Sequence, residues 1–209
     1  MVAPETAPEV TAYFAALVPA SEHEFVAGNG VERLRVTSYL TSAPPPSMYV
    51  RSVRCVVLRT NSVLALRGHR DGRAHVLPGG RREPGETLLQ TLEREVLEEA
   101  GWTTTAPRQI GVVRLTWLTP LPEAWPEARH FHPDFLWLIH AAEAGEHRPG
   151  AMLPDMEEGE PVFLKLDDPD ALAPLERSPW ATENQVFLAE AVRARRVSRT
   201  RSWSSRAGG

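Results

Sequence analysis

The stretch from Gly80 to Trp102, GRREPGETLLQTLEREVLEEAGW, constrains the fold more than any other part of the chain. Thr87 and Gln90 have the spacing of a capping box, which predicts a helix start. Gly101 supplies a stop signal for that helix. Between them, apolar residues recur at helical spacing on one face: Leu88, Leu89, Leu92, Val96, Leu97 and Ala100. The sequence therefore predicts an amphipathic helix from Thr87 to Gly101.

Three glutamates of this helix share one side of it. Glu95, Glu98 and Glu99 stand at i, i+3 and i+4, which places them within an arc of roughly 100°. Like charges at this spacing destabilise a helix by a few tenths of a kcal/mol per pair. A hard divalent cation such as Mg²⁺ would offset that cost, because it prefers carboxylate oxygens. The helix alone is also compatible with an ordinary solvated face, on which Arg94 and Glu98 form an i, i+4 ion pair.

A glycine loop precedes the helix. Pro78, Gly79 and Gly80 follow the short apolar segment Val76–Leu77. Glycine allows the backbone to approach a ligand closely or to turn sharply. A strand, a glycine loop and a helix start together favour phosphate binding, so Gly79 and Gly80 are predicted to contact substrate.

The full stretch resembles the Nudix box, G-x5-E-x7-R-E-U-x-E-E-x-G-U, in which U is a bulky aliphatic residue. Every spacing of that pattern is matched here, by Gly80, Glu86, Arg94, Glu95, Val96, Glu98, Glu99, Gly101 and Trp102. Trp102 is the one departure, because it stands where an aliphatic residue is usual. This is a packing position, and the match covers about two dozen residues directly.

The resemblance implies a fold and an activity. The fold is an α/β/α sandwich with a mixed β-sheet, extending over residues 49 to 166 or so. The activity is Mg²⁺- or Mn²⁺-dependent hydrolysis of the diphosphate linkage in a nucleoside diphosphate joined to another group. The alternative is a nucleotide-binding sensor or regulator of the same fold that does not hydrolyse its ligand. The intact box favours the enzyme, whereas the substrate stays undetermined.

The resemblance also assigns roles to box residues. Glu95, Glu98 and Glu99 would hold the metal with help from the Gly80 carbonyl, and Glu98 and Glu99 would count as catalytic. Arg94 would orient the box carboxylates through ion pairs and is grouped with the catalytic residues. The structural box positions are Glu86 and Gly101, of which Glu86 would fix the loop.

Candidate substrate contacts outside the box are Arg67, Trp125 and His132. Trp125 lies in a polar loop and could stack a nucleobase, while Trp117 and Trp137 are the other candidates, with core packing favoured for Trp137. His130, His132 and Asp134 alternate and could share one face of a strand. They could form a zinc site, although we expect them to line the substrate cleft or cap a strand.

An acidic segment from Asp155 to Glu160 separates two predicted strands. A mobile acidic loop could close over a bound diphosphate, and a carboxylate within it could accept a proton from water. Glu157 and Glu158 are the candidates for this general base. The alternative is an ordinary solvated loop.

The remaining pattern indicates one domain with two appendages: a 1–48 N-terminal extension, a 49–197 hydrolase domain and a flexible 198–209 tail rich in Arg and Ser. Strands are predicted at 31–41, 49–59, 62–67, 74–77, 108–119, 131–142 and 162–166. Besides the box helix, helices are predicted at 10–18 and 182–196, with a helical turn at 172–175.

Composition and the start of the sequence limit the expected location and partners of the protein. The chain has 209 residues, a net charge of −4 and one cysteine, which excludes an internal disulfide. Cys55 lies in an apolar run, so a buried, unreactive thiol is expected. No targeting signal or apolar span is visible at the start of the sequence, and we expect a cytoplasmic protein with a nucleotide-type small-molecule substrate. We expect no membrane partner and no nucleic-acid partner, and the sequence is compatible with a homodimer.

Overall fold

The structure, a computed structural model, describes residues 6–26, 32–68, 73–119, 134–153 and 159–204. Within these residues one sheet contains nine strands. In chain order they are β1 (Ser21–Val26), β2 (Arg33–Leu40), β3 (Val50–Arg59), β4 (Ser62–Arg67), β5 (Ala74–His75), β6 (Gly79–Arg81), β7 (Trp102–Trp117), β8 (Asp134–His147) and β9 (Glu160–Lys165).

The sheet is mixed. Its strand order is β1-β2-β7-β8-β3-β4-β5, with β6 paired to β3 and β9 paired to β4. The β3–β8 pair is parallel, whereas the other described pairs are antiparallel. The predicted hairpin between β3 and β4 is confirmed, since Arg59 pairs with Ser62 around Thr60 and Asn61.

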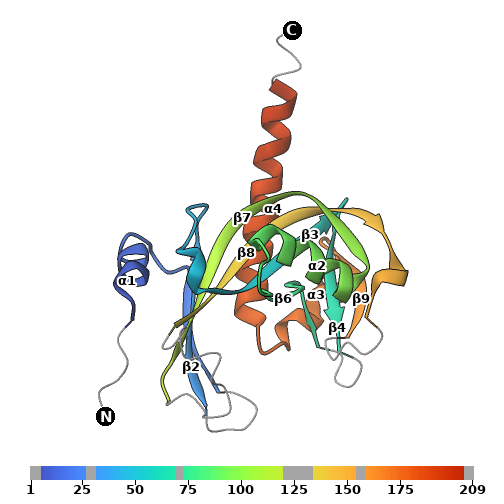
Figure 1. Cartoon of the computed structure of the whole chain (residues 1–209). Helices are drawn as coiled ribbons and strands as arrows, with labels where there is room; N and C mark the ends of the chain where they lie inside the picture. The colour runs from blue at the N-terminus through green and yellow to red at the C-terminus, as the bar shows by residue number, and fades with distance from the viewer. Residues whose placement is uncertain (1–5, 27–31, 69–72, 120–133, 154–158, 205–209) are drawn as a thin grey trace.

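Helices cover both faces of the sheet. The α-helices of the described part are α1 (Pro8–Ala15), α2 (Leu88–Ala100), α3 (Pro169–Glu176) and α4 (Ala181–Ser204), and short 3-10 helices occupy Ser47–Tyr49 and Pro149–Ala151. One core contains Leu92 and Val96 of α2, whereas the other contains Phe187 and Ala191 of α4. The predicted α/β/α sandwich with a mixed sheet is therefore confirmed, and Figure 1 shows these layers.

The N-terminal segment continues the same fold. β2 pairs with β7 along seven positions, from Leu34↔Trp117 to Leu40↔Gly111. Val10 and Phe14 of α1 are buried in the core that α2 covers. The described part of the segment expected to be an extension is thus structurally continuous with the sheet that follows it.

Several strands differ from the sequence-based expectation. β1 was not predicted, because its residues are mostly polar and only alternate ones turn inward. β6 was expected to be loop, yet it pairs with β3 through Gly79↔Arg54. β7 begins at Trp102 instead of residue 108, with register irregularities around Thr105 that let the strand pass Pro107. Trp102 itself stacks on His147 at 4.5 Å between ring centroids, which fits a packing role.

The C-terminal end of the chain differs from the expectation of a tail without regular structure. α4 continues to Ser204, so residues 198–204 are helical. No glycine or proline interrupts the sequence between Ala181 and Ser204, so nothing local stops the helix. In Figure 1 the last turns of α4 project beyond the sheet. No helix in the described part combines the length and hydropathy that a membrane span requires.

Candidate active site

The start and stop of α2 are those predicted from the sequence. The Thr87 hydroxyl accepts from the Gln90 backbone N–H at 3.2 Å, and the Gln90 side chain accepts from the Thr87 N–H at 2.9 Å. Gly101 ends the helix in the left-handed conformation, with φ +69°. These local contacts fix the two ends of α2, the helix that carries the glutamates beside the glycine segment, residues 78–80.

Neighbouring atoms come close to the backbone at both Gly79 and Gly80. Gly79 has φ +138°, and a Cβ there would overlap the Val53 carbonyl oxygen. At Gly80 an added Cβ would overlap the Glu95 carboxylate. The Gly80 carbonyl oxygen accepts a hydrogen bond from the Ser52 hydroxyl at 2.7 Å. The segment is therefore packed directly against the acidic side of α2.

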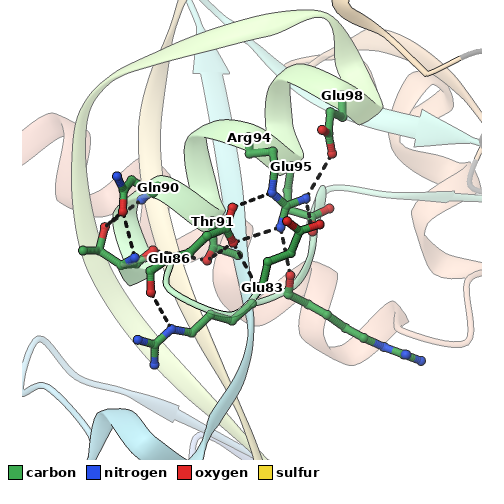
Figure 2. A network of polar contacts seen from close by, with 10 residues as sticks. Glu83, Glu86, Gln90, Thr91, Arg94, Glu95 and Glu98 are labelled. Atoms are coloured by element: carbon green, nitrogen blue, oxygen red, sulfur yellow. Dashed lines mark hydrogen bonds and ion pairs between the residues drawn. The ribbon is translucent and has the colours of Figure 1, made fainter.

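Arg94 is the centre of the polar network that Figure 2 shows. Its Nε donates to Glu86 at 2.6 Å, and its Nη1 donates to Glu95 at 2.9 Å and to Glu98 at 3.0 Å. Its Nη2 donates to the Arg81 carbonyl oxygen at 3.0 Å. The predicted Arg94–Glu98 ion pair is thus one contact among several, and the guanidinium joins three carboxylates to the glycine segment.

Glu86 is held as an anion in this network. The hydrogen bond from Arg94, assisted by the Glu83 backbone N–H and the Thr91 hydroxyl, lowers the pKa of Glu86 to about 2. The same contact raises the pKa of the Arg94 guanidinium above its ordinary value. Both groups are therefore charged at neutral pH, and their ion pair joins the loop before α2 to the helix.

The three predicted metal ligands line the same cleft, and Glu99 is held differently from the other two. Glu99 is buried with 2 % exposure and accepts from the Gly79 backbone N–H at 2.7 Å, whereas Glu95 and Glu98 contact Arg94. Among the described residues, no group of three or more His, Cys, Asp or Glu side chains has its ligating atoms gathered around one point.

The available donors nevertheless suit a hard divalent cation. Glu95, Glu98 and Glu99 line one cleft with Gly80, and carboxylate and carbonyl oxygens are the ligands that Mg²⁺ and Mn²⁺ prefer. A Cβ added at Gly80 would overlap a carboxylate oxygen of Glu95, so the backbone at Gly80 lies close to this one carboxylate. The donor set thus fits the ion that the box predicts.

The cleft extends far beyond the box. It has a volume of about 700 Å³. One end is polar and is lined by Arg51, Ser52, Arg54, Gly80, Arg81, Glu95, Glu98 and Glu99. The other end is mainly apolar and is lined by Phe25, Leu34, Leu115, Trp117, Phe135, Trp137 and Trp180. Glu32 also lines the cleft, as does Leu153, whose backbone N–H donates to the Glu98 carbonyl oxygen of α2 at 3.0 Å. The arrangement joins an anion-binding end to an aromatic end.

Some residues predicted to bind substrate lie elsewhere. Arg67 is exposed at the end of β4 and does not line the cleft. Asp134 is buried in an ion pair with Arg114, at 2.8 Å from its Nε. Burial raises the pKa of Asp134, but the hydrogen bonds from Arg114, Thr116 and Thr6 outweigh this and lower it. Asp134 therefore has a structural partner, which argues against its use as a metal ligand.

Other predicted residues fall outside the described part of the chain. These are Trp125, His130, His132, Glu157 and Glu158. Of the other tryptophan candidates, Trp117 is 7 % exposed and Trp137 is half-buried. Both line the cleft, and Trp137 also packs against the core, which was the favoured interpretation for it. Cys55 is fully buried, as expected, and burial raises the pKa of its thiol.

Sequence reasoning missed several cleft residues. Arg51 and Arg54 interrupt the otherwise apolar strand β3, and that interruption was a usable signal. Phe25 belongs to the unpredicted strand β1, and Trp180 precedes α4 directly. Neither carries a local signal, because only the folded sheet brings them to the cleft.

Comparison with known proteins identifies the family of this chain. The family model described as "NUDIX domain" matches residues 48–190, which is more than half of the chain. The chain therefore belongs to the Nudix family, as the box indicated.

Individual relatives are more distant. A Bacillus subtilis protein named "Putative 8-oxo-dGTP diphosphatase" is 35 % identical over 65 residues, which are 31 % of this chain and 44 % of that protein. The match thus spans less than half of that relative. Among solved structures, a Nudix hydrolase from Nitrosomonas europaea is 19 % identical, with a TM-score of 0.48 over 68 % of this chain and 90 % of the other. A Bacillus subtilis pyrophosphohydrolase is 20 % identical, with a TM-score of 0.46 over 76 % and 99 %.

Proposed function

We propose that the chain is a pyrophosphohydrolase that depends on Mg²⁺ or Mn²⁺ and cleaves the diphosphate linkage of a nucleoside diphosphate joined to another group. The observation that carries the proposal is the cleft, because the acidic side of α2 opens into it beside three arginines and an aromatic wall. Family membership supports the same class of reaction.

The polar end of the cleft supplies groups of both charges. Glu95, Glu98 and Glu99 offer the oxygen donors for the cation. When bound, such an ion neutralises phosphate charge and lowers the pKa of a water ligand. Arg51, Arg54 and Arg81 place cationic side chains at the same end, where guanidinium groups bind phosphate oxygens strongly. A diphosphate is the group that this combination of charges suits.

The roles of the chain's residues follow from their contacts. Arg94 orients Glu95 and Glu98 through hydrogen bonds of 2.9 and 3.0 Å. The Glu99 carboxylate accepts a hydrogen bond from the Gly79 backbone N–H, which keeps the carboxylate and the glycine segment at a fixed distance. Water attacks phosphorus, and the leaving phosphate departs in line as the bridging P–O bond breaks. The proton of the attacking water passes to a general base, for which Glu157 and Glu158 stay the predictions.

The proposal is tested by a screen for product release. Nucleotide sugars, ADP-ribose, dinucleotides, dinucleoside polyphosphates and nucleoside triphosphates are each incubated with Mg²⁺ or Mn²⁺, and phosphate or nucleoside monophosphate is measured. Glu98→Gln and Glu99→Gln should lower kcat at least about 100-fold, because metal electrostatics contribute several kcal/mol to such reactions.

Glu93→Gln is the matched control for this screen. Glu93 is exposed on the same helix and does not line the cleft, so its kcat should stay near that of the wild type. Near-normal kcat and metal affinity in Glu99→Gln would overturn the assignment. Metal-dependent nucleotide binding without any product release would favour the sensor instead.

A further inference from the structure

The apolar end of the cleft contains a cluster of partly exposed aromatic rings. Phe25, Trp137 and Trp180 are half-buried, whereas Trp117 and Phe135 beneath them are buried. Phe25 and Trp180 stack at 5.1 Å between centroids, and Trp180 lies 4.7 Å from Trp137. The rings form one wall, which leaves aromatic surface facing the cleft.

This wall is joined to the box by neighbouring strands. The pairing runs from β6 through β3, β8, β7 and β2 to β1. Across it, Arg81 pairs with Ser52, Ser52 with Trp137, and Leu34 with both Trp117 and Phe25. The cleft therefore crosses the sheet, with the box carboxylates at one end and Phe25 at the other.

The charged residues of the cleft indicate which kind of ligand contacts the aromatic wall. The three arginines and the box carboxylates at the polar end suit a metal-bound diphosphate. The Arg54 guanidinium lies 4.4 Å above the Trp137 ring and so marks the junction between the two ends. An occupant that fills both ends carries a diphosphate at one end and a planar aromatic group at the other.

We propose that the Phe25–Trp180–Trp137 wall is the subsite for the nucleobase of the substrate, and that Phe25 and Trp180 supply its stacking surface. The inference rests on the proposed function, because the diphosphate at the polar end positions the base. Every nucleobase has a π-face, so any base can stack on an aromatic side chain.

The N-terminal strand gives the subsite a distinctive origin. Phe25 lies in β1, outside residues 48–190 that match the family model. β1 is aligned by its pairing with β2, where Phe25 opposes Leu34. Part of the stacking surface therefore comes from a segment that lies outside the family match.

The test separates binding of the base from hydrolysis. Affinities of AMP and GMP are compared with that of ribose 5-phosphate by calorimetry in EDTA, using the full chain. The wild type should bind the nucleotides more tightly, by between about 5-fold and 100-fold, which corresponds to the stacking of one base. Phe25→Leu keeps apolar volume without a π-face, so it should remove most of this difference. Phe25→Tyr should restore it.

Phe163→Leu is the matched control. Phe163 is also a half-buried phenylalanine, but it contacts Trp102 on β7 and does not line the cleft. Its nucleotide affinity should equal that of the wild type. Thermal unfolding of each variant verifies that the fold is retained, and Trp180→Leu provides a second variant if Phe25→Leu is unfolded.

Two outcomes distinguish the subsite from the proposed function. Equal binding of nucleotides and ribose 5-phosphate, or a preference that survives both Phe25→Leu and Trp180→Leu, would overturn the subsite even if nucleotides are hydrolysed. Base-dependent binding that these variants abolish would support the subsite even in a chain that releases no product, in which case only the proposed hydrolysis fails.

Discussion

Gly79 donates its backbone N–H to the carboxylate of Glu99 at 2.7 Å, across 20 positions of sequence. The bond joins the glycine segment to the most buried glutamate of α2. The neighbouring Pro78 carbonyl oxygen accepts from the Cys55 N–H of β3 at 2.9 Å. The segment is thus held between the sheet and the helix. A change in its backbone should therefore lower the stability of the fold and also disturb the site.

Gly79→Ala should destabilise the protein and reduce turnover. A side chain at φ +138° is strained, and its Cβ would overlap the backbone of Val53 and Arg54. We expect a loss of at least about 1–3 kcal/mol in the free energy of unfolding, measured by urea denaturation. Gly150→Ala is the matched control, since no atom lies within 4 Å of its added Cβ. Equal midpoints for the two variants would contradict the close approach at Gly79.

Arg94→Lys should weaken both the fold and the site. Lysine keeps the charge but cannot reproduce the forked contacts to Glu86, Glu95 and Glu98. We expect roughly 1–3 kcal/mol of destabilisation from lost charged hydrogen bonds, together with a lower kcat. Arg148→Lys, at an exposed pair with Glu146, should change stability by less than about 1 kcal/mol. Comparable effects of both substitutions in thermal unfolding would count against the network.

His140 should contribute to acid sensitivity. Burial lowers its pKa from 6.5 to about 4, so the folded state favours the neutral ring. Between pH 6.5 and pH 4 the unfolded chain binds more protons at this residue, and stability therefore falls as pH decreases through that window. In His140→Leu the drop in unfolding free energy from pH 7 to pH 4.5 should be smaller by about 2 kcal/mol. An unchanged drop in urea titrations at the two pH values would contradict this role.

A chain that ends at Val197 should keep its activity. Among the described side chains of the deleted segment, Ser198 accepts from Arg108 at 2.6 Å, at an exposed position. We expect hydrolysis of a small nucleotide within about 2-fold of the wild type, because exposed contacts contribute little to stability. A chain that ends before Phe187 should fail to fold, since Phe187 is fully buried in the core. If the chain that ends at Val197 loses kcat while circular dichroism shows an intact fold, residues 198–209 belong to the site.

Sequence rules that relate neighbouring residues were sufficient to predict the helix of the box. The capping pair Thr87–Gln90, the stop at Gly101 and the common side of Glu95 and Glu98 depend on residues at most a few positions apart. The need for glycine at position 79 was also visible as part of a glycine segment. These features were readable because helix geometry relates neighbouring residues in a constant way.

The lining of the cleft was decided by the tertiary structure. Phe25 and Trp180 meet because β1 pairs with β2 at one edge of the sheet while α4 packs across its face. Arg67 was a reasonable candidate by composition, yet its strand directs it away from the cleft, whereas Arg51 and Arg54 enter it. The sequence by itself determined the family, the box helix and the common side of its glutamates, since these follow from local spacing. Which distant side chains complete the cleft depends on strand register and sheet curvature, and these are set by long-range packing that no local pattern specifies.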